Sequence, residues 1–216
     1  MVLLFWSEFN SYLEIKTASE MFIDVNRGGD KLNINVDIEL YRLPCSILSL
    51  DIQDVMGSHT VNIHGSLMKY RLDKDKKILG EEKYNVKEKK KDVAKKDDDD
   101  DHDDDSMPDY ELVKKEISNQ EGCKIKGYFL VNKVPGNFHI SSHAFSPIIH
   151  RLYTDGLLNF DLSHKINHIS FGDDKDFKII KTRFNTGELS PLDHTEKVDS
   201  NKKFYEYYLK VRKITL

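Results

Sequence analysis

The sequence predicts a mainly β protein, built as an antiparallel sandwich or barrel with little helix. Apolar and polar residues alternate over several short stretches, turn residues separate these stretches, and few stretches follow a helical period. This pattern argues against a sheet of parallel strands, because such a sheet needs helical crossovers between its strands. A chain of 216 residues is long enough to bury the core of one large β domain.

The clearest strand pattern covers residues 32–40, where alternate positions are apolar and the others are asparagine or acidic. Residues 27–30, with the sequence Arg-Gly-Gly-Asp, form the predicted turn before it. Two more strands are predicted over 47–55 and 59–64, with a hairpin-like break at 56–58. We expect these stretches to form the first strands of an antiparallel sheet.

The second part of the chain has the same organisation. Residues 124–134 are rich in aromatic and β-branched side chains and predict a strand, which a turn at 135–137 connects to a further strand at 138–141. Apolar residues at near-helical spacing predict a short helix over 143–153. Residues 204–214 alternate again and predict a last strand.

Charge is balanced overall but unevenly placed. Lysine and arginine total 33 against 37 aspartate and glutamate residues, a formal net charge of -4, which argues against a nucleic-acid partner. A lysine-rich block at 87–96 runs directly into an aspartate-rich block at 97–105, and neither has enough apolar surface to offset the entropy of ordering. We therefore predict a disordered spacer over 83–106, between the folded segments 14–82 and 107–216.

No familiar catalytic or metal-binding motif is present in the sequence. Ser163 and His164 are neighbours with Asp161 close by, but adjacent residues on a strand point to opposite faces and make no relay. The aspartate block lacks the spaced ligands and the glycine turn of a calcium-binding EF-hand loop. We therefore predict a protein that is not an enzyme and has no cofactor and no metal site.

Histidine is frequent, with nine residues in the chain. His164 and His168 would share one face of a helix, but residues 164–171 alternate as well as they follow a helical period. Because imidazole is the side chain that titrates between neutral and mildly acidic pH, we favour a distributed pH response over a zinc site.

Two further features stay open on the residues alone. Cys45 and Cys123 lie on either side of the predicted spacer and either form one disulfide or remain two buried thiols. The apolar start of the chain stops at Ser7, far short of the ~20 residues that span a bilayer. With Trp6 near the end of this run, residues 1–13 match the last turns of a membrane helix.

Three motifs are specific enough to indicate a family. They are GCKIKGYFLVNKVPGNFHI at 122–140, SHKINHISFG at 163–172 and SPLDHTEK at 190–197. They resemble signature segments of the ERGIC family, the endoplasmic-reticulum vesicle cargo receptors that cycle between the ER and the Golgi. Residues 22–57 and 69–75 resemble the luminal opening of the longer, cysteine-rich branch of that family. The residues that match the signature are Asn132, Lys133, Gly136, Asn137, Phe138, His139, Ser163, His164, His168, Phe171, Gly172, Pro191, Leu192 and Asp193.

The resemblance implies a fold, a topology and a role. Family members carry two transmembrane helices around a luminal domain, a twisted antiparallel β-sandwich, so residues 1–13 would end the first helix and the second would follow Leu216. A disulfide between Cys45 and Cys123 is implied by the same resemblance, in an oxidising lumen. The implied role is that of the luminal portion of a cargo receptor of ER, intermediate-compartment and Golgi membranes, which enters coat protein complex II vesicles and retrieves ER proteins.

The implied partners are luminal cargo proteins, a second subunit of the same family in a hetero-oligomer, and the membrane through flanking helices. We expect His139, His164 and His168 to make cargo binding depend on pH. The alternative is a lectin-like or calcium-binding luminal protein without receptor activity. One departure from the cysteine-rich branch is clear: the lysine and aspartate blocks replace its cysteine-rich insert.

Overall fold

The chain folds into two antiparallel sheets. The computed structural model describes residues 2–13, 31–55, 59–60, 65–84, 107–157, 161–183, 189–199 and 204–211. Its strands are β1 (Lys31–Leu40), β2 (Ser49–Asp54), β3 (His59–Thr60), β4 (Gly65–Leu72), β5 (Ile78–Lys83), β6 (Gly122–Asn132), β7 (Gly136–Ser141), β8 (His164–Phe171) and β9 (Thr195–Lys197). Its helices are α1 (Val2–Leu13), α2 (Tyr110–Ser118), α3 (Ser146–Thr154) and α4 (Asp174–Arg183), with 3₁₀ helices η1 (Cys45–Ile47) and η2 (His143–Phe145). The predicted mainly β, antiparallel class is confirmed.

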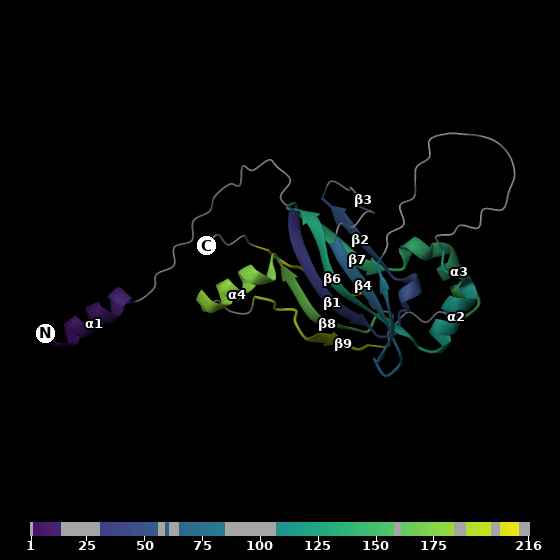
Figure 1. The fold of residues 1–216 in the computed structure, drawn as a ribbon, viewed down its shortest axis with the longest axis horizontal. Helices are drawn as coiled ribbons and strands as arrows, with labels where there is room; N and C mark the ends of the chain where they lie inside the picture. The colour runs from purple at the N-terminus through teal and green to yellow at the C-terminus, as the bar shows by residue number, and fades with distance from the viewer. Residues whose placement is uncertain are drawn as a thin grey trace, which may run out of the picture.

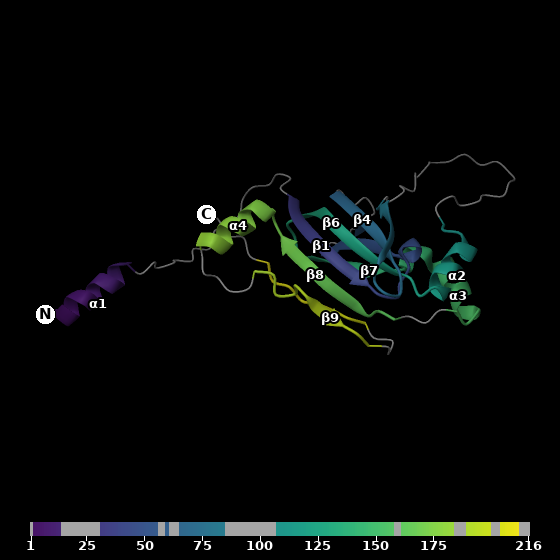
Figure 2. The same ribbon diagram turned by 60° about the horizontal axis from the view of Figure 1, so that its bottom comes forward.

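The larger sheet interleaves strands from both parts of the sequence. Its six strands have the order β5-β4-β6-β1-β8-β9, and the smaller sheet has the order β3-β2-β7. In Figures 1 and 2 the smaller sheet lies against one face of the larger sheet, as in a sandwich. Because β6 lies between β4 and β1, the segments before and after residues 85–106 share one sheet.

The alternation in β1 builds the core. Its inward-facing residues are almost fully buried: Ile34, Val36, Ile38 and Leu40. The asparagine and acidic residues between them lie on the opposite, outer face of the sheet. Phe129 of β6 contacts Phe138 of β7 edge-on, with 5.4 Å between ring centroids, and so connects the two sheets.

A disulfide joins η1 to β6. Cys45 and Cys123 are bonded, with their Cα atoms 4.9 Å apart, and both are buried. The pairing implied by the family resemblance is therefore present in the structure.

Helices α2 and α3 close one end of the sandwich. α3 confirms the helix predicted over 143–153, and its Leu152 is fully buried. The sequence pattern does not predict α2, although Asp109 caps it by accepting a hydrogen bond from the first turn. The guanidinium of Arg151 lies 3.9 Å from the ring centroid of Tyr110 and links α3 to α2. α4, also not predicted, projects from the opposite end of the larger sheet (Figures 1 and 2).

The predicted strand at 204–214 is wrong where the structure describes it, because residues 204–211 form no strand. Tyr205 and Tyr207 both lie against the ring of His164, at centroid distances of 4.9 and 5.9 Å. The two alternate tyrosines therefore contact the side chain of His164, and their spacing does not reflect pairing with a neighbouring strand.

The predicted spacer begins too early in the sequence. Lys83 is the last residue of β5, and the backbone N–H of Leu50 donates a hydrogen bond of 2.9 Å to the hydroxyl of Tyr84. Tyr84 also packs against the core, so it belongs to the folded part of the chain. The rest of the spacer, the turn at 27–30 and the break at 56–58 lie outside the described residues.

Helix α1 buries none of its residues, and most of its side chains are apolar. Among the helices that the structure describes, none has the length and apolar content needed to cross a membrane.

Candidate functional site

His168 and Asp193 join two of the signature segments. Nδ1 of His168 on β8 lies 2.7 Å from Oδ2 of Asp193. Oδ1 of the same carboxylate accepts a hydrogen bond of 3.0 Å from the backbone N–H of Ile169. The side chain of His168 is 41% exposed, so the pair lies in contact with solvent. A protonated imidazole here would form a charge-assisted hydrogen bond with the carboxylate.

A β-bulge in β8 sets the direction of this histidine. The register between β1 and β8 shifts between Asp37 and Ile38, which leaves Asn167 as the extra residue. The side-chain amide of Asn167 donates to Oδ1 of Asp37 at 3.0 Å and to Oε1 of Glu39 at 2.8 Å. The bulge thereby places His168 opposite Asp37, on the outer face of the larger sheet.

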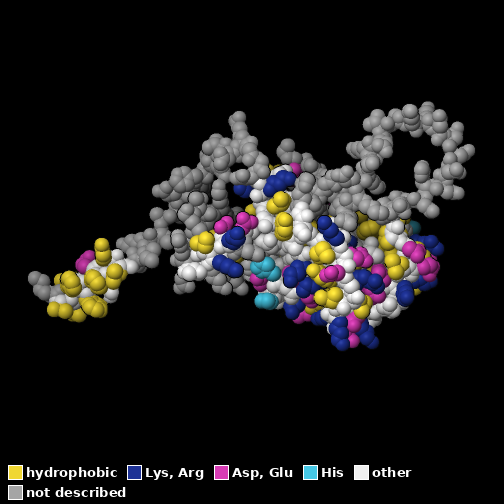
Figure 3. All heavy atoms as spheres, viewed as in Figure 1, with side chains coloured by type: hydrophobic (Ala, Val, Ile, Leu, Met, Phe, Trp, Pro, Cys, Tyr) yellow, Lys and Arg dark blue, Asp and Glu magenta, His cyan; other side chains and the backbone are white. Residues whose placement is uncertain are grey.

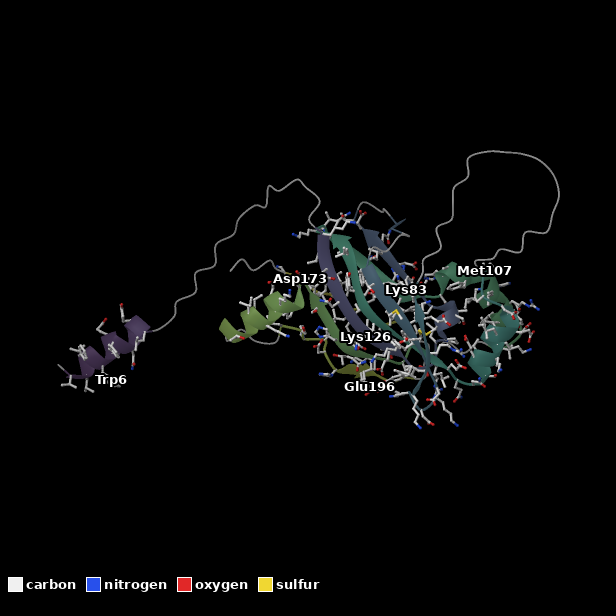
Figure 4. The ribbon with its side chains drawn as sticks, viewed as in Figure 1. Trp6, Lys83, Met107, Lys126, Asp173 and Glu196 are labelled. Carbon is white, nitrogen blue, oxygen red and sulfur yellow. A yellow bond between two sulfur atoms is a disulfide. The ribbon has the colours of Figure 1, made fainter. Side chains whose placement is uncertain are left out.

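The carboxylates of β1 near this histidine already have cationic partners. Nζ of Lys124 lies 3.0 Å from Oδ1 of Asp37 and 3.0 Å from Oε1 of Glu39. Nζ of Lys126 lies 3.6 Å from Oδ2 of Asp37, and Figure 4 shows Lys126 on this outer face. Asp193 is therefore the carboxylate that pairs with His168.

His139 forms a second, looser pair on the smaller sheet. Its Nε2 lies 3.7 Å from Oδ2 of Asp51 on β2, and the hydroxyl of Ser141 donates to the same oxygen at 3.0 Å. The ring of His143 in η2 faces it edge-on at 6.2 Å. Both members of the His139 pair are partly exposed, as in the His168 pair.

His164 has a different environment on the inner face of β8. Its Nδ1 lies 2.8 Å from the carbonyl oxygen of Leu162, and its Nε2 lies 2.8 Å from the hydroxyl of Tyr207. Burial raises the pKa of Tyr207, which keeps this hydroxyl a donor. Leu40 and Lys197 lie opposite His164 on the two neighbouring strands. The three predicted histidines therefore occupy three separate places and do not converge.

Ser163, His164 and Asp161 do not assemble a catalytic triad. The carboxylate of Asp161 accepts from the backbone N–H of Ser163 at 2.9 Å. The hydroxyl of Ser163 accepts from the backbone N–H of Asp199 at 3.1 Å. Both ring nitrogens of His164 have other partners, so no base lies against the serine.

The other signature residues shape the backbone or fill the core. A side chain at Gly136 would place its Cβ 2.7 Å from the carbonyl oxygen of Gln53, so the close approach of β7 to β2 requires glycine. Gly172 has φ +106° and donates its N–H to Asn33 at 2.8 Å. The side chains of Phe138, Phe171 and Leu192 pack against the core. The remaining signature residues lie in or beside turns and strand ends: Asn132, Lys133, Asn137 and Pro191.

A group of charged side chains beside the disulfide is not predicted from the sequence. Lys69 of β4 donates to the carbonyl oxygens of Cys45 at 2.9 Å and Leu48 at 2.6 Å, and burial lowers its pKa from 10.5 to about 8. Glu116 accepts from the hydroxyl of Ser46, and burial raises the pKa of its carboxyl group. The only sequence signal is that Lys69 occupies the position in β4 where the alternation places an inward-facing residue.

These side chains line an open cavity of about 340 Å³ together with Arg71, Met107 and Phe145. Arg71 is held by Glu121, whose carboxylate lies 2.7 Å from its Nη2. Since the charges are satisfied within the group, we assign it to holding η1 and α2 on the sheet. Within the described ranges, no three histidine, cysteine or acidic side chains are arranged to hold a metal ion.

Comparison with known proteins identifies two matching family models. The model described as "Endoplasmic Reticulum-Golgi Intermediate Compartment (ERGIC)" matches residues 1–61, and the model described as "Endoplasmic reticulum vesicle transporter" matches residues 109–216, half of the chain. The second match contains the signature segments that place His139, His164, His168 and Asp193.

Curated relatives support the same grouping. The chain is 31% identical to probable endoplasmic reticulum-Golgi intermediate compartment protein 3 of Dictyostelium discoideum, over 96% of this chain and 63% of that protein. It is 28% identical to endoplasmic reticulum-Golgi intermediate compartment protein 1 of Xenopus laevis, over 84% of this chain and 45% of that protein. The chain thus spans about half to two thirds of the length of these relatives. The crystal structure of Erv41p aligns with 81% of this chain at 17% identity and a TM-score of 0.42.

Proposed function

Because this chain belongs to the endoplasmic reticulum vesicle transporter family of the ER-Golgi intermediate compartment, we propose that it is the luminal, ligand-binding portion of a cycling cargo receptor. Its relatives in the intermediate compartment are trafficking proteins and not enzymes. In this proposal the chain binds escaped ER proteins, together with a second subunit of the family, and returns them in vesicles. The flanking membrane helices and the coat contacts belong to the same proposal.

The observation that carries the proposal is the His168–Asp193 pair, because it connects two signature segments at a partly exposed position. In this proposal, protonation of His168 changes its hydrogen bond to the Asp193 carboxylate into an ion pair at the surface. His139 repeats the arrangement beside Asp51, with His143 as the other titratable group facing it. We propose that these two pairs, with the buried His164, make ligand binding differ between neutral and mildly acidic compartments.

The test is binding of ER-resident proteins at two pH values. The immobilised chain is incubated with an ER luminal extract at about pH 7 and at about pH 6, and the retained proteins are quantified by mass spectrometry. We expect a set of ER residents whose retention changes between the two conditions, and we expect the change to disappear in a variant with His139→Gln, His164→Gln and His168→Gln. Retention that is equal at both pH values, or a pH effect unchanged by the triple substitution, contradicts the histidine mechanism.

A matched control uses His150→Gln, because His150 is an exposed histidine on α3 that has no part in the proposal.

The lectin-like or calcium-binding alternative predicts a different result. It requires binding of calcium in calorimetry or of glycans on an array, with no selection of ER proteins by the chain. That outcome would replace the receptor proposal.

A further inference from the structure

A small cavity lies where the β4–β5 turn meets the segment after β1. It has a volume of about 220 Å³, and its charged lining residues are Arg42, Lys74, Lys76 and Asp161. This volume is below the roughly 300 Å³ at which pockets for small-molecule ligands begin. It is large enough for one side chain of a bound protein segment. We propose that this cavity binds acidic side chains of a protein partner, which deepens the proposed function by naming the chemistry of its ligand.

The charge of the lining is the first argument. Three cations line the cavity against one carboxylate, on a chain whose formal net charge is -4. Asp161 is almost buried, and its Oδ2 lies 3.5 Å from Nε of Arg42. Its Oδ1 accepts a hydrogen bond from the backbone N–H of Ser163. Its charge is therefore already matched by Arg42. Figure 3 shows basic side chains, with acidic ones between them, at the lower tip of the domain, where the β4–β5 turn projects in Figure 1.

Lys74 is the cation that remains available. Lys76 has a carboxylate partner, because its Nζ lies 3.3 Å from Glu196, which Figure 4 labels below β8. In the part of the chain that the structure describes, Lys74 has no such ion pair. Arg42 is 54% exposed and its guanidinium carries more donors than Asp161 accepts. Lys74 thus offers an uncompensated positive charge to a carboxylate in the cavity, and Arg42 offers further hydrogen-bond donors.

The backbone around the cavity is fixed in advance. Oδ1 of Asp73 accepts from the backbone N–H groups of Asp75 and Lys77, at 2.8 Å each, and so holds the turn that carries Lys74. Nζ of Lys76 lies 3.6 Å from the ring centroid of Tyr41, whose hydroxyl pairs with Glu196. A turn held this way loses little freedom when a ligand binds.

Two lining residues adopt a strained backbone conformation. Lys76 has φ +64° and Gln120 has φ +57°, and both are in the left-handed region that favours glycine. Among the described residues only one other non-glycine residue, His194, has a positive φ. Both conformations belong to local motifs, because Gln120 follows the C-cap of α2 and Lys76 closes the β4–β5 turn. They fix the path of the backbone along the cavity.

The experiment measures binding of a defined acidic peptide to the full chain. The probe is a capped ten-residue peptide of alternating glutamate and serine, and the control peptide has glutamine in place of glutamate. Binding is followed by shifts of the backbone amide NMR signals of Arg42, Lys76 and Gln120. We expect the acidic peptide to shift these signals with an affinity in roughly the millimolar range, weakening as salt is added, and the glutamine peptide to leave them unchanged.

Substitutions assign the binding to the cavity. Lys74→Gln should weaken binding roughly two- to fivefold, and Arg42→Gln with Lys74→Gln about tenfold, which is the range for exposed charge pairs. Lys114→Gln with Lys115→Gln on α2 removes the same charge from exposed positions and should change nothing. Because Arg42 also pairs with Asp161, Lys74→Gln alone keeps the test valid if the double variant unfolds.

Three outcomes would overturn the inference. They are equal binding of the two peptides, acidic-peptide binding unchanged by Lys74→Gln, and inorganic phosphate that shifts the same signals without any peptide selectivity, which would mark a site for small anions. If the acidic peptide fails while the chain still selects ER proteins at neutral pH, this inference is wrong and the proposed function stands.

Discussion

Lys69 is a charged side chain on the inward face of β4. Since burial lowers its pKa from 10.5 to about 8, the unfolded chain binds more protons than the folded chain between these values. The free energy of unfolding should therefore rise with pH from about 8 to about 10.5, by about 3 kcal/mol in total. Below pH 8 the folded chain bears the full cost of burying the charged amine of Lys69. Urea unfolding across this range measures the slope.

Lys69→Met provides the matched comparison. Because this variant lacks the titrating amine, its stability should not rise between pH 8 and pH 10.5. It also leaves the carbonyl oxygens of Cys45 and Leu48 without this donor, at a cost that does not depend on pH. The exposed Lys114→Met should keep the slope of the original chain. A slope that survives in Lys69→Met would assign it to another group.

Asp193 is predicted to hold two segments of the signature. Asp193→Ala removes the acceptor for His168 and for the N–H of Ile169, and we expect a loss of about 1–2 kcal/mol in urea unfolding at neutral pH. Asp193→Asn keeps an oxygen for Ile169 but has no charge. It should therefore cost less than Asp193→Ala, because only the charged partner of His168 is lost. Equal costs for the two variants would contradict a separate contribution from the oxygen that accepts from Ile169.

At the level of elements, β6 depends on a glycine in its centre. Gly127 has φ +137°, and a Cβ there would lie 2.0 Å from the carbonyl oxygen of Ser66 on β4. Gly127→Ala should therefore cost about 2–4 kcal/mol or prevent folding, because β4 must move away from the middle of the larger sheet. Gly80→Ala on the edge strand β5 meets no atom within 4 Å and should change stability by less than about 1 kcal/mol. Thermal unfolding of the two variants compares them directly.

The elements also show what a sequence can predict. β1 could be predicted because one of its faces is buried and the other is in contact with solvent, which makes apolar and polar residues alternate along the whole strand. α2 is missed because its nine residues bury only Val113 and Glu116, too few to show a helical period. Residues 204–211 alternate without a strand partner, because Tyr205 and Tyr207 meet the ring of His164. Local pattern thus identifies which face is buried but not what covers it.

The candidate site is less predictable than the fold for the same reason. The signature motifs single out His168 and Asp193, but they are 25 residues apart, and only the fold brings them into contact. The extra residue Asn167 reverses the facing of His168, and no local pattern indicates such a bulge. Lys74 lies in a turn beside a cavity that several segments distant in the sequence form together, so no local pattern indicates its role.

The whole molecule makes a last prediction through its interleaved sheet. Trypsin should cut the lysine-rich block at 87–96 first, since composition predicts a solvated spacer there. The two fragments should stay together without reductant, because Cys45 and Cys123 join them across 78 positions. They should also stay together under native conditions after reduction, because β6 of the second fragment lies between β4 and β1 of the first.

Reduction should also weaken the uncut chain. The chain-entropy model gives a loop of this length roughly 4.5 kcal/mol, so reductant should lower the unfolding midpoint in urea of the uncut chain by a corresponding amount. A Cys45→Ala, Cys123→Ala variant should match the reduced chain and show no response to reductant. Size-exclusion chromatography of the cut, reduced protein gives the decisive result: separate fragments in native buffer would mean that the disulfide, and not the shared six-stranded sheet, holds the two parts of the chain together.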